Sequence, residues 1–175
     1  MRFFEELECK TWWIDNQKAA TNGRPLWPPD NMTRVKIVFP DKGYKYYMYS
    51  KFILEAIGDN YKGLLLWVEN HYIWPSSENL HMYYKLCESY GEHRKLEEVP
   101  GIYFVENDNN DLITFLQMGM LFGWEMYLGQ LDNGISIKIS NDEFIEIDLI
   151  NNESAKAIFN RAEDMNYKPY LINAG

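Results

Sequence analysis

Cysteine is scarce in this sequence: Cys9 and Cys87 are the two among 175 residues, and they show no CxxC or metal-type spacing. Small secreted domains carry many cysteines in disulfides, so two isolated thiols are typical of a reducing compartment. The first eight residues include three acids and lack the long apolar segment of a secretory signal. We therefore expect a cytoplasmic protein.

Long hydrophobic runs and positive charge are also lacking. The longest apolar run lies near residues 64–68, whereas a bilayer span needs about 20 apolar residues. Lys and Arg number 17 against 26 Asp and Glu, which gives a formal net charge of −9. A nucleic-acid-binding protein needs a basic surface that displaces counterions from the phosphates. We therefore expect neither a membrane nor a nucleic acid as partner.

The sequence contains none of the common catalytic motifs. GxSxG, the GxxxxGK[ST] phosphate loop, GxGxxG and HExxH are all absent. We therefore expect no catalytic residues, no bound metal and no cofactor, and we favour a protein that is not an enzyme.

Aromatic residues, by contrast, are abundant, with 6 Trp, 13 Tyr and 9 Phe. Each buries a large area, so a modest chain can assemble a substantial core. The length suits one domain, residues 1–175. Within it, prolines at positions 25, 28 and 29 mark a loop that separates an N-terminal arm, residues 1–31, from a compact core, residues 32–175.

Apolar periodicity predicts strands and helices in the first part of this core. Residues 34–39 alternate apolar and basic side chains before Pro40, which is typical of a half-buried strand. The Tyr-rich segment 44–49 is expected to form a second strand. Apolar residues at helical spacing then stop at Gly58, and the choice between strand and helix for residues 50–58 stays open.

The remaining periodicity completes the predicted fold. It indicates strands over 63–68 and 102–105, an amphipathic helix over about 77–90, and an almost wholly apolar helix over 112–122 that should be central and buried. Asn133-Gly134 favours a hairpin turn, and the alternating residues 135–149 belong to a three-stranded meander before a last helix, 153–164. We predict an α+β fold: a mixed, mainly antiparallel sheet, two or three packed helices and the C-terminal meander. A three-layer α/β arrangement is the alternative.

Negative charge is concentrated in one stretch of the chain. Residues 88–153 contain 14 acids and three bases, a net charge of −11, whereas the rest of the chain carries +2. If the meander forms, Glu146 and Asp148 share its outer face, with Asp142 and Glu143 at the turn. Such a surface can steer a basic protein toward it. These four acids are our candidate partner-binding residues, although a solvated acidic face is the simpler explanation of any such charge cluster.

A second set of candidates lies where the strand 63–68 leads into the helix 77–90. Its polar and aromatic side chains could line a cleft at a rigidly held junction; they are Glu69, His71, Trp74, Ser76, Ser77, Glu78 and His81. Glu78 and His81 have the i, i+3 spacing of a di-iron helix, but the second such pair is missing. A capped helix start after Pro75 explains the same residues structurally.

Three functions therefore compete. The first is a non-enzymatic interaction module whose acidic surface docks a basic protein partner. On charge alone, an immunity or antitoxin protein would fit this description. The second is a small-molecule-binding or hydrolytic protein with a cleft at residues 69–81. The third is a structural or oligomeric component whose exposed aromatic residues are buried between copies.

Short motifs across residues 67–148 resemble a group of uncharacterised bacterial cytosolic proteins. The motifs are Trp74-Pro75-Ser76-Ser77-Glu78-Asn79, Tyr83-Tyr84, Tyr90-Gly91, Pro100-Gly101 and Phe122-Gly123-Trp124. The resemblance implies a bacterial protein with a specific role for the junction, and it carries over no activity, ligand, fold or functional residue.

Overall fold

The structure, a computed structural model, describes residues 1–16, 20–21, 24–25, 33–58, 62–70, 80–106, 109–130 and 135–173. Its strands are β1 (Arg2–Phe4), β2 (Ala20–Thr21), β3 (Arg24–Pro25), β4 (Thr33–Val38), β5 (Leu65–Asn70), β6 (Gly101–Tyr103), β7 (Glu125–Gly129), β8 (Ile135–Ser140), β9 (Phe144–Leu149) and β10 (Pro169–Asn173). Its helices are α1 (Glu6–Asn16), the 3-10 helix η1 (Gly43–Lys45), α2 (Tyr46–Ile57), α3 (Leu80–Ser89), α4 (Asn109–Phe122) and α5 (Asn152–Asp164).

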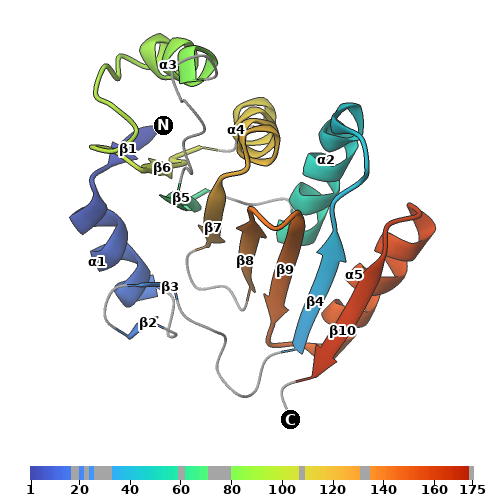
Figure 1. Cartoon of the computed structure of the whole chain (residues 1–175). Helices are drawn as coiled ribbons and strands as arrows, with labels where there is room; N and C mark the ends of the chain where they lie inside the picture. Colours follow the sequence, from blue (N-terminus) through green and yellow to red (C-terminus); the bar gives the residue numbers. More distant parts are fainter. Residues whose placement is uncertain are drawn as a thin grey trace.

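One large sheet organises the molecule. Eight strands lie in the order β1-β6-β5-β7-β8-β9-β4-β10, and every described pairing among them is antiparallel. The sheet therefore has two edges, β1 and β10, which lie at opposite ends of the array in Figure 1. The predicted α+β class and the β7-β8-β9 meander are confirmed. The α/β alternative needs parallel neighbours, and the described strands have none.

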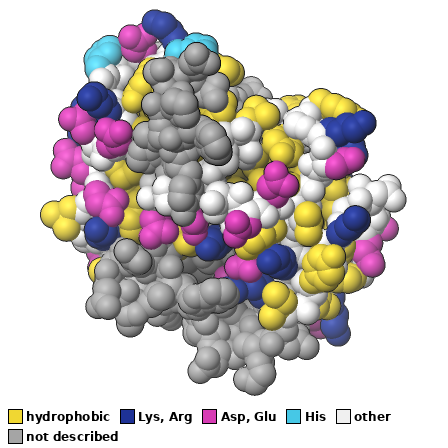
Figure 2. All heavy atoms as spheres, viewed as in Figure 1, with side chains coloured by type: hydrophobic (Ala, Val, Ile, Leu, Met, Phe, Trp, Pro, Cys, Tyr) yellow, Lys and Arg dark blue, Asp and Glu magenta, His cyan; other side chains and the backbone are white. Residues whose placement is uncertain are grey.

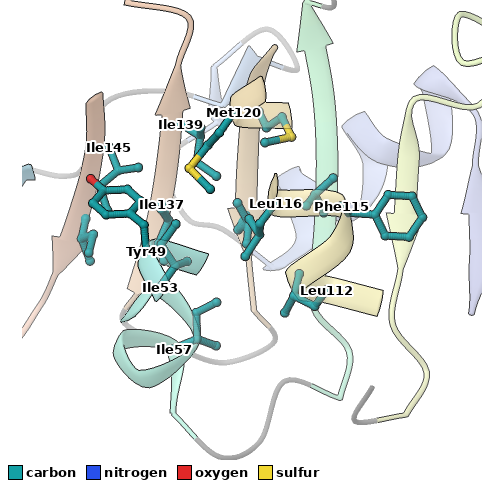
Figure 3. Close-up of a cluster of buried hydrophobic side chains, with 14 of the residues drawn as sticks. Tyr49, Ile53, Ile57, Leu112, Phe115, Leu116, Met120, Ile137, Ile139 and Ile145 are labelled. Atoms are coloured by element: carbon teal, nitrogen blue, oxygen red, sulfur yellow. The ribbon is translucent and has the colours of Figure 1, made fainter. Parts of the chain in front are cut away.

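The main core lies between one face of the sheet and helices α2 to α5. Alternate residues of the meander, including Ile137, Ile139 and Ile145, point to this face and meet side chains of α2 and α4 (Figure 3). As predicted, α4 is central and buried: Leu112, Phe115 and Leu116 have no measurable exposure. Both α3 and α5 also contribute buried residues to this core.

The opposite face carries a smaller aromatic core built by the N-terminal residues. Trp12 and Trp13 of α1 pack with Leu65 and Trp67 of β5, while the alternate β5 residues face the main core. The ring centroids of Trp13 and Trp67 are 6.1 Å apart. Strand β1 also joins the sheet. Residues 1–16, which belong to the predicted N-terminal arm, are thus part of the folded layers.

The largest error in the predicted elements concerns residues 44–49. They form η1 and the start of α2 rather than a strand, and residues 50–57 continue the same helix. Tyr49, Ile53 and Ile57 recur every fourth residue and are buried against the sheet, so helical burial outweighs the strand preference of tyrosine. Gly58, with φ at +94°, ends the helix as expected.

The helices in the described part of the chain are short or interrupted by polar residues. None of them is both long and apolar enough to cross a bilayer.

Candidate functional site: an open sheet edge

At the predicted cleft, Glu69 lies at the end of β5, beside an irregularity in the pairing with β7. Burial, together with the carboxylates of Glu69 and Glu125, raises the pKa of the Tyr127 phenol. That phenol donates a hydrogen bond of 3.0 Å to Glu125, and Lys138 lies 2.7 Å from the same carboxylate oxygen. Glu69 therefore belongs to a satisfied polar group on the α1 side of the sheet.

His81 lies elsewhere. It is exposed on α3, whose buried residues Tyr83 and Cys87 face the main core on the other side of the sheet. The structure thus places the Glu69 side chain beside Tyr127 on the α1 face of the sheet, whereas His81 is on a helix that packs against the other face. The other candidates lie outside the described residues and stay predictions: His71, Trp74, Ser76, Ser77 and Glu78. Among the residues that are described, no group of three or more His, Cys, Asp and Glu side chains could hold a metal ion.

Two of the four acidic candidates are not on an exposed surface. Glu146 and Asp148 are only 7% and 6% exposed. Arg34 lies opposite Asp148 on β4; its Nε is 2.7 Å from the Asp148 carboxylate, and its Nη1 is 3.4 Å from Glu146. The expectation that both acids face solvent is therefore wrong, because Glu146 and Asp148 are buried and their charges are paired with Arg34 across the strands. Burial raises the pKa of Asp148, while the hydrogen bonds from Arg34 oppose this shift.

The remaining pair, Asp142 and Glu143, is exposed in the β8–β9 turn. Glu143 has φ at +64°, which suits the last residue of a three-residue hairpin loop. Its carbonyl oxygen accepts a hydrogen bond of 2.7 Å from the Phe39 amide, so the turn is held against the end of β4. These two acids remain available to a partner.

Glu143 also lines a pocket of about 860 Å³ where β4 ends and β10 begins. Other lining residues include Phe39, Tyr44, Met48, Tyr167 and Lys168. Two further ones, Asp41 and Lys45, form an ion pair of 2.9 Å, and the Lys45 hydrogen bond lowers the pKa of Asp41.

Next to this pocket, β10 forms an open edge of the eight-stranded sheet. Its inner side pairs with β4 in the register Tyr170–Lys36 and Leu171–Val35. No described strand pairs with its outer side. Tyr170, Leu171 and Ile172 are 52%, 42% and 45% exposed, so three successive large apolar side chains lie on this edge. In Figure 2, acidic and basic side chains are interspersed over the described part of the face in view, without one field of a single sign.

The hydrogen bonds of β4 show which peptide groups of β10 point outward. The Phe39 amide donates to Glu143 on the β9 side, and the Val38 amide donates to the Lys168 carbonyl on the β10 side. Peptide groups of successive residues alternate between the two sides of a strand. Counting from Lys168, the peptide groups of Tyr170 and Ile172 therefore point toward β4. The peptide groups of Pro169, Leu171 and Asn173 point outward, away from β4. Pro169 has no N–H, but its position points away from β4, so no hydrogen bond between β10 and β4 is lost.

Sequence reasoning missed this edge. A strand signal was present after the last helix: a proline followed by an aromatic, an aliphatic and a β-branched residue, Pro169-Tyr170-Leu171-Ile172. The sequence did not indicate which strand it pairs with, because β4 lies far from it in the chain.

Comparisons with known proteins add no relative: no protein-family model, no curated protein and no solved structure matches this chain.

Proposed function

We propose that this protein is a non-enzymatic interaction module that binds a protein partner along the outer edge of β10. The observation that carries the proposal is the outward-facing peptide groups of Leu171 and Asn173, next to three exposed apolar side chains. An extended segment adds to such an edge through main-chain hydrogen bonds, and its alternate side chains supply specificity.

The composition of this edge supports the proposal. Natural sheets commonly protect an edge with charged side chains, strong twist or a covering element, because an open edge pairs with other chains. The three central residues of β10 are instead uncharged and exposed. The opposite edge, β1, has three residues and includes Arg2, so it is shorter and bears a charge. Of the two edges, β10 is the better template for an added strand.

Two exposed acids lie near one end of this edge. Lys168, which precedes β10, and Glu143 line the same pocket, so a segment that runs past Pro169 approaches the turn that carries Asp142 and Glu143. Both acids are exposed. Any acidic contribution to partner binding thus comes from this turn rather than from the buried Glu146 and Asp148.

The test compares two variants of one residue. Leu171→Pro removes the outward N–H and leaves the hydrogen bonds of Tyr170 and Ile172 to β4 in place; Leu171→Ala shortens the side chain and keeps the N–H. Immobilised wild type, each variant and a blank surface are exposed to a lysate of the source organism, and retained proteins are quantified by mass spectrometry. We expect a partner retained by the wild type and Leu171→Ala and lost from Leu171→Pro. Equal retention by all three proteins would exclude the edge as the binding surface.

A further inference from the structure

We infer that the strand completing this edge is β10 of a second copy of the chain, paired antiparallel across a two-fold axis at Leu171. The inference rests on the proposed function and names its partner. In a two-fold interface the same surface meets itself, so the edge must be complementary to its own reversed sequence.

The hydrogen-bonding groups of the edge meet this requirement. With Leu171 opposite Leu171 of the second copy, each Leu171 N–H donates to the carbonyl of the other. Pro169 then lies opposite Asn173 of the second copy, and each Asn173 N–H donates to a Pro169 carbonyl. All five residues of β10 are paired by four hydrogen bonds. The missing N–H of Pro169 removes only the two bonds at the ends.

The exposed side chains also match in this register. Tyr170 lies opposite Ile172 of the second copy, on the face that carries their intrachain partners Lys36 and Arg34. Aromatic and β-branched residues form favourable cross-strand pairs. The two Leu171 side chains meet on the other face, where Val35 lies. Each of the three exposed apolar side chains of β10 thus contacts an apolar side chain of the second copy.

The helices leave room for this arrangement. Helix α5 packs on β4, β10 and β9. In the joined sheet, β4 and its symmetry mate are three strand spacings apart, or about 14 Å at the usual spacing of about 4.8 Å. A helix with its side chains is about 10–12 Å wide. The two α5 helices therefore lie side by side, and the two sheets join into one sheet of sixteen strands.

The first experiment measures mass against concentration by sedimentation or light scattering. An interface built on one short strand per copy is small, so the concentration series extends from the low micromolar into the millimolar range. We expect the mass to rise from 20.8 kDa toward twice that value, and Leu171→Pro to stay at 20.8 kDa throughout. Leu171→Ala keeps the N–H and should still double its mass, at a higher concentration.

A charge exchange tests the two-fold axis directly. Leu171→Lys and Leu171→Glu each place two like charges opposite one another, so each variant alone should be monomeric. An equimolar mixture should recover the doubled mass. Leu7 provides the matched control: it is 74% exposed on α1, and the same pair of substitutions there should leave the doubled mass unchanged.

Amide hydrogen exchange locates the interface. At low concentration the Tyr170 and Ile172 amides should be protected by β4 while the Leu171 amide exchanges freely; at high concentration Leu171 should become protected. A wild type that stays monomeric, or a dimer that forms equally well with Leu171→Pro, would overturn the inference. The proposed function would then stand or fall by the lysate comparison, because a different protein retained through the Leu171 N–H needs no second copy.

Discussion

Arg34 and Asp148 face each other across β4 and β9, and the Arg34 guanidinium donates hydrogen bonds of 2.7 and 3.1 Å to the Asp148 carboxylate. Glu146 lies 3.4 Å from the same guanidinium. All three side chains are at most 9% exposed. Buried charges are costly to desolvate, so such a cluster tolerates the loss of one member poorly.

We predict that Arg34→Met lowers the free energy of unfolding by about 3–5 kcal/mol, because it leaves two buried carboxylates without this cation. Urea denaturation followed by tryptophan fluorescence measures the change. Lys45→Met is the matched control, since it breaks the exposed pair with Asp41 and should cost far less, because solvent screens such a pair. Equal effects of the two substitutions would show that the Arg34 cluster is solvated.

Gly101 leaves no room for a side chain. A Cβ added there would lie 2.8 Å from the Phe4 Cβ and would overlap the Cys9 sulfur, because α1 packs directly over β6. Gly101→Ala should therefore destabilise the protein by about 1–3 kcal/mol. Cys9→Ala in the same chain removes one of the two clashes, so a double-mutant cycle of unfolding free energies should show favourable coupling. If the effects of Gly101→Ala and Cys9→Ala on the unfolding free energy were simply additive, the strain would not arise from the contact with the Cys9 sulfur.

The two thiols should be unreactive in the native protein. Cys9 and Cys87 are 0% and 1% exposed. Burial raises the pKa of Cys87 to about 11 and that of Cys9 still further, so the nucleophilic thiolate is scarce at pH 8. We expect a chromogenic disulfide reagent to titrate two thiols promptly in denaturant and neither promptly in buffer. A fast native reaction of one thiol would indicate local opening of α1 or α3.

Glu92 should contribute an acid-sensitive part of the stability. Hydrogen bonds from Arg94, chiefly from its guanidinium, lower the pKa of Glu92 from 4.5 to about 2. The folded protein therefore holds this carboxylate ionised more strongly than the unfolded chain does. The resulting stability is fully present above pH 4.5 and is lost as the pH falls toward 2.

The stability difference between wild type and Glu92→Gln should accordingly shrink across that pH range in chemical denaturation. Arg94→Met should remove the same pH-dependent part, since it removes the main hydrogen-bond donor. If the difference between wild type and Glu92→Gln were constant from pH 6 to pH 2, the pair would not be formed in solution.

Local periodicity predicted much of the fold correctly. Alternation of Ile137 and Ile139 with polar residues correctly predicted a strand of the meander, because a strand with one buried face repeats every second residue. The hairpin turn predicted at Asn133-Gly134 lies outside the described residues. The apolar run of α4 was likewise sufficient for a buried helix. At residues 44–49 the same method failed, because closely spaced tyrosines satisfy a strand preference and a helical repeat at once.

The candidate sites were harder to predict, because partners in a sheet are brought together from distant parts of the chain. Charge counts correctly found the acids but not that Arg34 buries two of them, since that depends on β4 lying beside β9. Glu69 and His81 are close in sequence, yet Glu69 lies on the α1 face of the sheet while the helix that carries His81 packs against the other face. The open edge depends on β10 pairing with β4 while nothing described pairs with its other side.

Composition and periodicity by themselves determined the α+β class, the meander, the buried helix and the concentration of acids in one stretch. The tertiary structure alone decided which charges are paired, which face α1 covers and which strand is left at the edge. The physical reason is that the spacing of apolar residues along the sequence determines which face of a helix or strand a side chain occupies. Which side chains lie opposite it depends on the order of the strands in the sheet. That order leaves the strand after the last helix, Pro169–Asn173, at the edge of the sheet, where we propose that another chain binds.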